Sequence, residues 1–180
     1  MLRTIFIYGA AAGVIAGGAL SVFVLGIGHA IPGGMAIGYL TMLLAFSLIP
    51  VAIRREGTAR GGVIRFWPAF GLGLGVSAVA AVFYVAMWEA SCAISGIDFA
   101  RDYAAGLIAD KRAAGASAAE LARFEQEMAA FRVSYANPLI RLPMTFSEIF
   151  PVGLIVSLAS AALLRNPRVL AGRRAVQPAA

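Results

Sequence analysis

The sequence is poor in the residues that build most catalytic and metal sites. Its 180 residues include one cysteine, Cys92, and one histidine, His29. A single cysteine excludes a disulfide within the chain, and one cysteine with one histidine cannot supply the ligands of a usual zinc site. The motifs H-E-x-x-H, G-x-S-x-G and the P-loop are also absent. We therefore expect no catalytic residues, no bound metal, no cofactor and no enzymatic activity.

Charged residues are scarce as well. They make up 13% of the chain against 61% hydrophobic residues, and the mean hydropathy is +0.84. A soluble domain is about half apolar and about a quarter charged. The net charge of +6 comes from arginines and lysines outside the long apolar runs, and no basic helix is interleaved with aromatic residues. This composition predicts an integral membrane protein and argues against a nucleic-acid partner.

Four apolar stretches are long enough to cross a membrane as helices, because about 20 residues span the hydrocarbon layer. They cover residues 4–27, 34–53, 66–94 and 142–164. The apolar part of the first stretch exceeds the roughly 7–15 residues of a signal peptide, so we expect it to remain as a helix. The sequence thus predicts an all-α fold, a four-helix transmembrane bundle that forms a single membrane domain over residues 1–180.

Positive charges in the connections predict the orientation of the bundle. One arginine precedes the first span, four lie between the second and third spans, and four follow the last one. Cytoplasmic loops carry an excess of arginine and lysine. We therefore expect both termini, including the tail at 165–180, to be cytoplasmic. The long connection between the third and fourth spans then lies outside.

This long polar connection, residues 95–141, predicts an amphipathic helical hairpin. Gly115 separates two helical patterns, and Ser117 with Glu120 has the spacing of a capping box. Spacings of three and four give the second helix one apolar face. This face consists of Leu121, Phe124, Met128 and Phe131. We expect it to pack on the partner helix or lie on the outer leaflet; the alternative is a lid or a docking surface for a partner.

Small residues four apart predict close packing of the first and third spans. Steps of three and four connect the third-span glycines to Glu89 through Val82, which places Glu89 on the same predicted seam. Packing inside the bundle is favoured over a homo-oligomer interface. The glycines concerned are Gly9, Gly13, Gly17, Gly71 and Gly75.

Two glutamates, Glu89 and Glu148, lie within the third and fourth spans. A carboxylate at membrane depth is costly and usually faces a bundle interior or a water-filled cavity. Both are near the outer ends of their spans, at the level of Tyr39 in the second span. Pro151 cannot donate a hydrogen bond to the carbonyl of Ser147, which leaves a further polar group there. We predict that these five residues form one buried polar site.

Three functions remain open for this arrangement. The leading one is a non-enzymatic structural or accessory subunit with the outer hairpin as its recognition surface, because catalytic motifs are absent. An alternative is an oligomeric carrier or channel, coupled to protons or cations, that uses Glu89 and Glu148. A second alternative is a binder of lipid or of a small amphiphile. The expected partners are membrane lipids and either a second copy of the chain or another membrane protein.

Several segments also resemble one family. They are IFIYGAAAGVIAGG, IGYLTMLLAFSLIPVAI, GGVIRF, FYVAMWE, YANPL and SEIFPVGLIVSLASAALL. These strings are similar to the small bacterial inner-membrane family catalogued as domain of unknown function 4199, and the resemblance covers nearly the whole chain. It implies a location in the bacterial inner membrane and matches Tyr39, Glu89 and Glu148 to family motif positions. It implies no activity, since none is established for the family.

Overall fold

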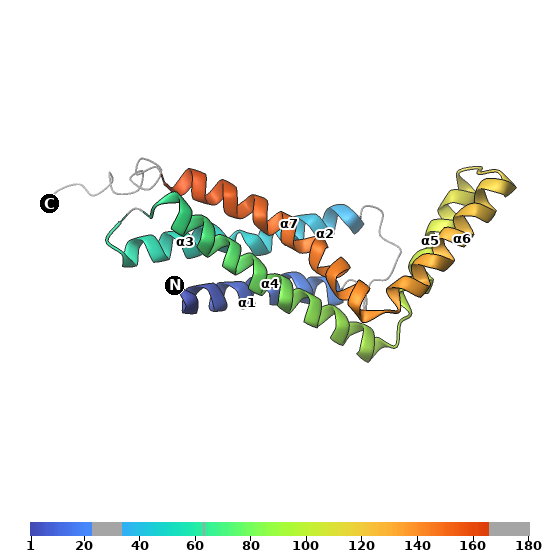
Figure 1. The fold of residues 1–180 in the computed structure, drawn as a ribbon, viewed down its shortest axis with the longest axis horizontal. Helices are drawn as coiled ribbons and strands as arrows, with labels where there is room; N and C mark the ends of the chain where they lie inside the picture. The colour runs from blue at the N-terminus through green and yellow to red at the C-terminus, as the bar shows by residue number, and fades with distance from the viewer. Residues whose placement is uncertain (23–33, 63, 166–180) are drawn as a thin grey trace. The chain divides into compact units, whose positions relative to one another are not determined.

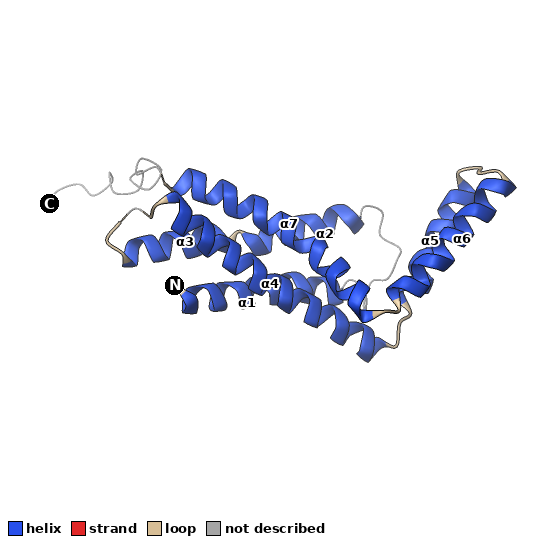
Figure 2. Ribbon diagram, in the orientation of Figure 1, coloured by secondary structure: helices blue, strands red, loops and turns tan. Residues whose placement is uncertain are grey.

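The structure is a computed structural model that describes residues 1–22, 34–62 and 64–165. Every regular element in these ranges is an α-helix, as Figure 2 shows, so the predicted all-α fold is confirmed. The helices follow one another along the chain as coloured in Figure 1. They are α1 (Leu2–Val22), α2 (Gly34–Phe46), α3 (Leu48–Ala59), α4 (Phe66–Ser95), α5 (Phe99–Ala113), α6 (Ala118–Tyr135) and α7 (Pro138–Leu164).

Four helical stretches are long and apolar enough to cross a membrane, as predicted. The last residues of the first predicted span, 23–27, lie outside the described residues, as do residues 166–180 of the predicted tail. The stretches are Leu2–Val22, Ala36–Ala59, Phe66–Ser95 and Pro138–Leu164.

The second of these stretches consists of α2 and α3, which are interrupted at Ser47. Pro50 has no backbone N–H, so the carbonyl of Phe46 cannot accept the usual helical hydrogen bond. The Ser47 hydroxyl donates to the carbonyl of Leu44 at 2.6 Å at the break. The helix then continues past Ile53, its predicted end, because the arginines and the glutamate that follow are good helix formers.

The described chain packs as two compact units. Among the described residues, the first unit comprises those within 1–88 together with 146–165, and the second comprises Glu89–Thr145. The hairpin, which was expected to be part of a single domain, therefore packs in the second unit with the end of α4 and the start of α7.

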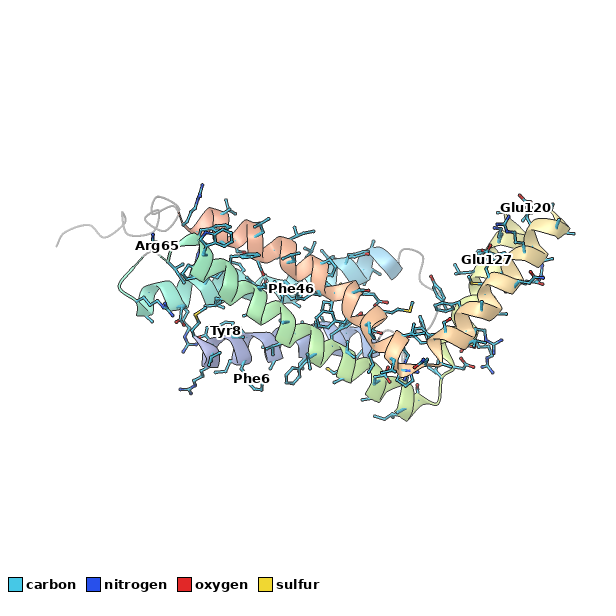
Figure 3. The ribbon with its side chains drawn as sticks, viewed as in Figure 1. Phe6, Tyr8, Phe46, Arg65, Glu120 and Glu127 are labelled. Carbon is cyan, nitrogen blue, oxygen red and sulfur yellow. The ribbon has the colours of Figure 1, made fainter. Side chains whose placement is uncertain are left out.

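The core of the first unit is formed by large apolar side chains from α2, α3, α4 and α7. Phe46, for example, lies among the helices of this unit (Figure 3). The core side chains that are fully buried include Phe46, Ile49, Ile53, Leu72, Val76 and Ile149.

The first unit also packs α1 against α4 through glycines. A Cβ atom added to Gly13 would lie 2.5 Å from the carbonyl oxygen of Ala80, and one added to Gly9 would lie 2.6 Å from a side-chain carbon of α4. Gly17 meets Met87 further along both helices, so α1 and α4 run parallel. These three predicted glycines thus lie where the two helices touch inside the unit.

Of the two glycines predicted to pack on α4, one contacts α1 and the other contacts no helix in the described chain. Gly75 is in contact with α1, since an added Cβ would lie 2.9 Å from Ile5. An added Cβ at Gly71 would meet nothing within 4 Å. Because α1 begins at Leu2, it has no turn that could lie beside Gly71. The predicted packing role of Gly71 therefore has no counterpart within the described chain.

Other small residues, whose role was not predicted, bring α4 and α7 together. A Cβ at Gly73 would lie 2.9 Å from Ser157, and one at Gly153 would lie 2.6 Å from the hydroxyl oxygen of Ser77. The two serine hydroxyls are fully buried and share a hydrogen bond of 3.1 Å. The hydroxyls also lie 2.9 Å from the carbonyl oxygen of Gly73 and 2.6 Å from that of Gly153, so both polar groups have hydrogen-bond partners inside the apolar interface.

In the second unit, α5 and α6 form a hairpin in which each helix begins with a side-chain cap. The Asp98 carboxylate accepts a hydrogen bond from the backbone N–H of Arg101 at 3.0 Å. Ser117 and Glu120 form the predicted capping box, in which each side chain bonds the other residue's backbone N–H. Gly115 permits the turn between the helices because its φ is +82°.

The predicted apolar face of α6 lies half-buried against α5. The ammonium of Lys111 lies 4.3 Å from the ring centre of Phe124, and the rings of Tyr103 and Phe131 are 5.9 Å apart. Leu121 and Met128, the other members of this face, are half-buried as well. Packing on the partner helix thus occupies this face, whereas charged residues such as Glu120 and Glu127 lie on the exposed side (Figure 3).

Candidate functional site

None of the five residues predicted to form one buried polar site is buried in the described chain. Tyr39 on α2 is 52% exposed, and Glu89 on α4 is half-buried. Glu148, Ser147 and Pro151 on α7 are exposed. Glu89 belongs to the second unit and the other four belong to the first, and each glutamate has its own partner within its unit.

The phase of α7 explains why Glu148 is exposed. The buried side of this helix carries Ile149, Gly153 and Ser157, which follow one another at intervals of one turn. Consecutive residues lie about 100° apart around a helix of about 3.6 residues per turn, so Glu148 lies at the edge of that side and not on it. Since α7 is apolar nearly all round, its sequence does not show which side is the core side.

The buried side of α4 also differs from the predicted one. The predicted seam led through Val82 to Glu89, but Val82 is 61% exposed. Small residues occur on several sides of α4, so their spacing alone did not identify the side that faces the core. The buried side carries Leu72, Val76, Ala80 and Tyr84 instead.

Within the first unit, Glu148 is hydrogen-bonded to Tyr84. The Tyr84 hydroxyl donates to Oε2 of Glu148 at 3.4 Å, and Tyr84 itself is 2% exposed. The core therefore fixes the hydroxyl, while the carboxylate lies at the edge of the helix bundle. A phenol hydroxyl can pair with a carboxylate and with a carboxylic acid, so this contact is compatible with either protonation state of Glu148.

Within the second unit, Glu89 forms an ion pair with Arg141. Nε of Arg141 lies 2.7 Å from Oε1 of Glu89, and Nη2 contacts the other carboxylate oxygen. Arg141 was expected in the connection, but α7 begins earlier, at Pro138, with Asn137 accepting a hydrogen bond from the next backbone N–H. Two parallel hydrogen bonds between opposite charges make a strong, directional contact.

A cleft of about 760 Å³ opens beside this ion pair in the second unit. A second pair of charged groups, Arg132 and Asp98, lines it with a separation of 4.0 Å between nitrogen and oxygen. The rest of the lining is mostly apolar. It consists of Cys92, Ala93, Ile97, Phe99, Ala100, Ala129, Val133, Tyr135 and Ala136.

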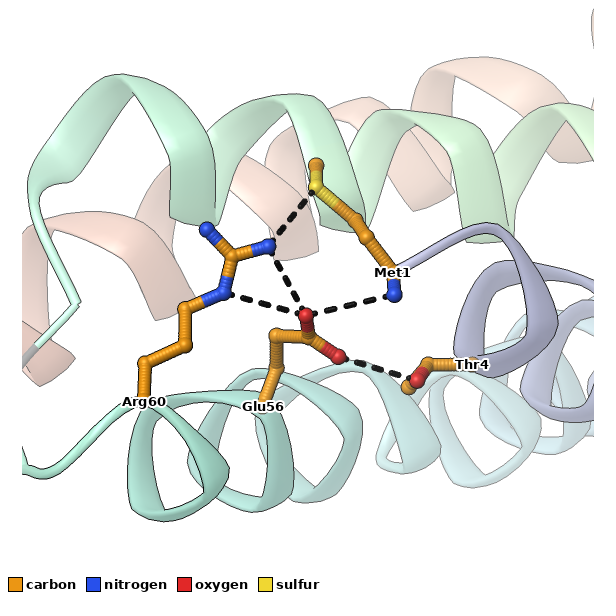
Figure 4. A network of polar contacts seen from close by, with 4 residues as sticks. All are labelled: Met1, Thr4, Glu56 and Arg60. Carbon is orange, nitrogen blue, oxygen red and sulfur yellow. Dashed lines mark hydrogen bonds and ion pairs between the residues drawn. The ribbon is translucent and has the colours of Figure 1, made fainter.

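A third polar site, around Glu56, was not predicted (Figure 4). Glu56 on α3 is 8% exposed and accepts hydrogen bonds from the Thr4 hydroxyl at 3.0 Å and from Arg60 at 2.9 and 3.1 Å. The amino group of Met1 lies 3.3 Å from the same carboxylate. The site joins α1 to α3 within the first unit. Residue 56 was missed because its neighbouring arginines were interpreted as a loop.

The three glutamates on the membrane-capable stretches each have a hydrogen-bond partner in the described ranges. In these ranges no group of three or more His, Cys, Asp and Glu side chains is placed to hold a metal ion. Glu56 and Glu89 are each bonded to an arginine, and Glu148 is bonded to a phenol. Of the three, Glu148 is the one that lies exposed on a membrane-capable helix without a positive partner in the described chain.

Comparison with known protein families gives a match over most of the chain. The sequence model of the family described as "Protein of unknown function (DUF4199)" matches residues 11–166. No curated protein matches the sequence, and no solved structure matches it.

Proposed function

This chain belongs to the DUF4199 family of proteins of unknown function, and we propose that it is a non-enzymatic protein of the bacterial inner membrane that acts as a structural or accessory subunit. In this role it assembles with a second chain, either another membrane protein or another copy of itself. Four helices that are long and apolar enough to cross a membrane support the membrane part of the proposal.

The exposed position of Glu148 carries the proposal. Glu148 lies ten residues after the start of α7, a helix of 27 residues that is apolar enough to span a membrane. A carboxylate that faces lipid is costly, so membrane helices normally turn such a group toward protein or water. Tyr84 supplies one hydrogen bond, but the side chain is otherwise left at the surface of the unit. A second chain packed on this side of α7 would cover it.

The hairpin supplies a further surface for assembly in this proposal. Helix α6 has no buried residue, although both helices of the hairpin are capped and joined by aromatic contacts. Since the apolar face is occupied by α5, recognition falls to the exposed side, which includes Gln126 and Ala130.

Site-directed cross-linking in native membranes tests the proposal. Cys92 is replaced by alanine, and Ser147, next to Glu148 on the exposed side of α7, is replaced by cysteine. The matched control places the cysteine at Val82, which is 61% exposed on α4. We expect a cross-linked species of one discrete mass from Ser147→Cys and none from Val82→Cys. Equal products from both positions, or none from either, would overturn the proposed assembly.

A carrier or channel coupled to protons or cations is the second candidate. The contact between Glu148 and Tyr84 favours it, because a surface carboxylate paired with a neutral hydroxyl can gain and lose a proton. The test is ion flux into liposomes that contain the full-length protein. This function predicts that Glu148→Gln abolishes a flux that the wild-type protein supports. Flux that is indistinguishable from that of empty liposomes excludes the candidate.

A further inference from the structure

The cleft in the second unit is a site to which neither the sequence nor the family assigns a role. It is enclosed by the last turns of α4, the start of α5, the end of α6 and the first turn of α7. All of its lining residues belong to this one unit. In a helix that crosses a membrane, the ends lie where lipid head groups meet water. On the proposed membrane location, the ends of α4 and α7 that enclose the cleft lie at that level.

The acidic groups of the cleft already have donors of their own. Both carboxylate oxygens of Glu89 accept hydrogen bonds from Arg141. One carboxylate oxygen of Asp98 caps α5 by accepting from the backbone N–H of Arg101. These contacts leave the acids of the cleft with little capacity to attract a cation.

The guanidinium groups, in contrast, retain hydrogen-bond donors. Arg132 has a side chain that is 48% exposed, and its ion pair with Asp98 is long, at 4.0 Å. Arg141 uses two nitrogens on Glu89, and its third nitrogen donates to the carbonyl of Tyr135 at 3.4 Å, which is also long. A guanidinium presents several N–H donors in a planar fork that matches a phosphate or carboxylate. The hydrogen-bond donors that remain unused in the cleft are therefore suited to binding an anion.

The apolar wall of the cleft indicates what is attached to that anion. Alanines, Ile97, Phe99 and Val133 make up most of the lining, and Val133 is 76% exposed. A site with a few charged groups on one side and apolar side chains on the other suits an amphiphile. We propose that the cleft binds an anionic phospholipid, whose phosphate is held by Arg132 and by the free donors of Arg141, with its glycerol and upper acyl carbons against the apolar wall.

The proposal does not depend on a protein partner, so it can fail or succeed separately from the accessory-subunit function. Full-length protein in a neutral detergent is titrated with phosphatidylglycerol, with diacylglycerol that has the same chains, and with inorganic phosphate. Thermal unfolding is one readout. Maleimide labelling of Cys92, the one cysteine of the chain, is the second, because this residue lines the cleft.

We expect phosphatidylglycerol to raise the unfolding temperature and to slow the labelling of Cys92, and diacylglycerol and inorganic phosphate to do neither. Arg132→Gln should weaken the effect of phosphatidylglycerol about tenfold, the change expected for losing a hydrogen bond to a charged group. Arg132→Lys should recover part of it. Arg123→Gln is the matched control, since Arg123 lies on the same helix, is 84% exposed and does not line the cleft.

Three outcomes would overturn the proposal. Equal effects of diacylglycerol and phosphatidylglycerol would show that the head group is not recognised. Equal effects of inorganic phosphate would show that a free anion, and not a lipid, is the ligand. An equal loss in Arg123→Gln and Arg132→Gln would show that any surface arginine attracts the lipid.

Discussion

A Cβ atom at Gly13 would lie 2.5 Å from the carbonyl oxygen of Ala80, so α1 and α4 leave no room for a side chain at this point. The obstacle is backbone, which cannot move aside as the end of a flexible side chain can. In a membrane, helices associate by close packing and not by the hydrophobic effect, so the fit of these two helices matters for the stability of the first unit.

Gly13→Val is therefore expected to destabilise the protein by about 1–3 kcal/mol, the usual cost of overpacking a tight interface. Thermal unfolding in detergent measures the change. The control is the same substitution at Gly71, where an added Cβ meets nothing within 4 Å. An unfolding temperature that falls as far in Gly71→Val as in Gly13→Val would contradict this account of the packing.

Glu56 also contributes to the stability of the first unit. Glu56→Gln keeps the shape of the side chain but removes the charge that pairs with Arg60 and with the Met1 amino group. Because Glu56 is itself buried and accepts hydrogen bonds from Thr4 and Arg60, we expect a loss of about 1–3 kcal/mol, typical of weakening hydrogen bonds to a charged group. In Glu127→Gln, which affects an exposed pair with Arg123, the loss should be under about 1 kcal/mol. A smaller loss in Glu56→Gln than in Glu127→Gln would count against the assigned role of Glu56.

The sequence predicted the features that depend on local pattern. Four apolar stretches and the capping box of Ser117 and Glu120 are visible in composition and spacing, and the structure confirms them. The positions that the sequence did not predict depend on which way a uniformly apolar helix is turned. Glu148 lies one residue from the fully buried Ile149, and nothing in the surrounding letters distinguishes the two orientations. Arg141 lies 52 residues from Glu89 and Thr4 lies 52 residues from Glu56, so spacing could not reveal these two contacts. The pair of Glu56 with Arg60, four residues apart, is visible in the spacing only if the segment is taken as a helix and not as a loop.

The capping box predicts how the hairpin responds to acid. Hydrogen bonds from the Ser117 hydroxyl and backbone N–H lower the pKa of Glu120 below its ordinary value. A carboxyl group whose pKa is lower in the folded state stabilises the fold above its unfolded pKa, about 4.3 for glutamate, and loses this effect as the pH falls through the folded value. Hydrogen exchange in the first turn of α6, corrected for intrinsic rates, should therefore lose protection below about pH 4. In Glu120→Gln this dependence should be weaker; an unchanged pH profile would contradict the assignment to Glu120.

From the ion pair of Glu89 and Arg141 we predict that the two side chains are energetically coupled. Each partner is partly buried, with side-chain exposures of 29% for Glu89 and 24% for Arg141. Arg141→Gln leaves a carboxylate without its cation on a membrane-capable helix, so we expect it to destabilise the second unit by about 1–3 kcal/mol. The double variant Glu89→Gln with Arg141→Gln removes both charges and should recover part of that loss, because the uncompensated charge is gone.

The wild-type protein, Glu89→Gln, Arg141→Gln and the double variant are each denatured in mixed micelles. Their unfolding free energies give the interaction energy of the pair as a double-mutant cycle. Hydrogen exchange in α5 and α6, compared with exchange in α1 and α3 of the first unit, shows whether the change is confined to the second unit. If the two single losses simply add in the double variant, the pair is not coupled and the contact contributes nothing of its own. A favourable coupling would mean that the pair joins the last turns of α4 to the first turn of α7, and thus holds together the helix ends that enclose the cleft.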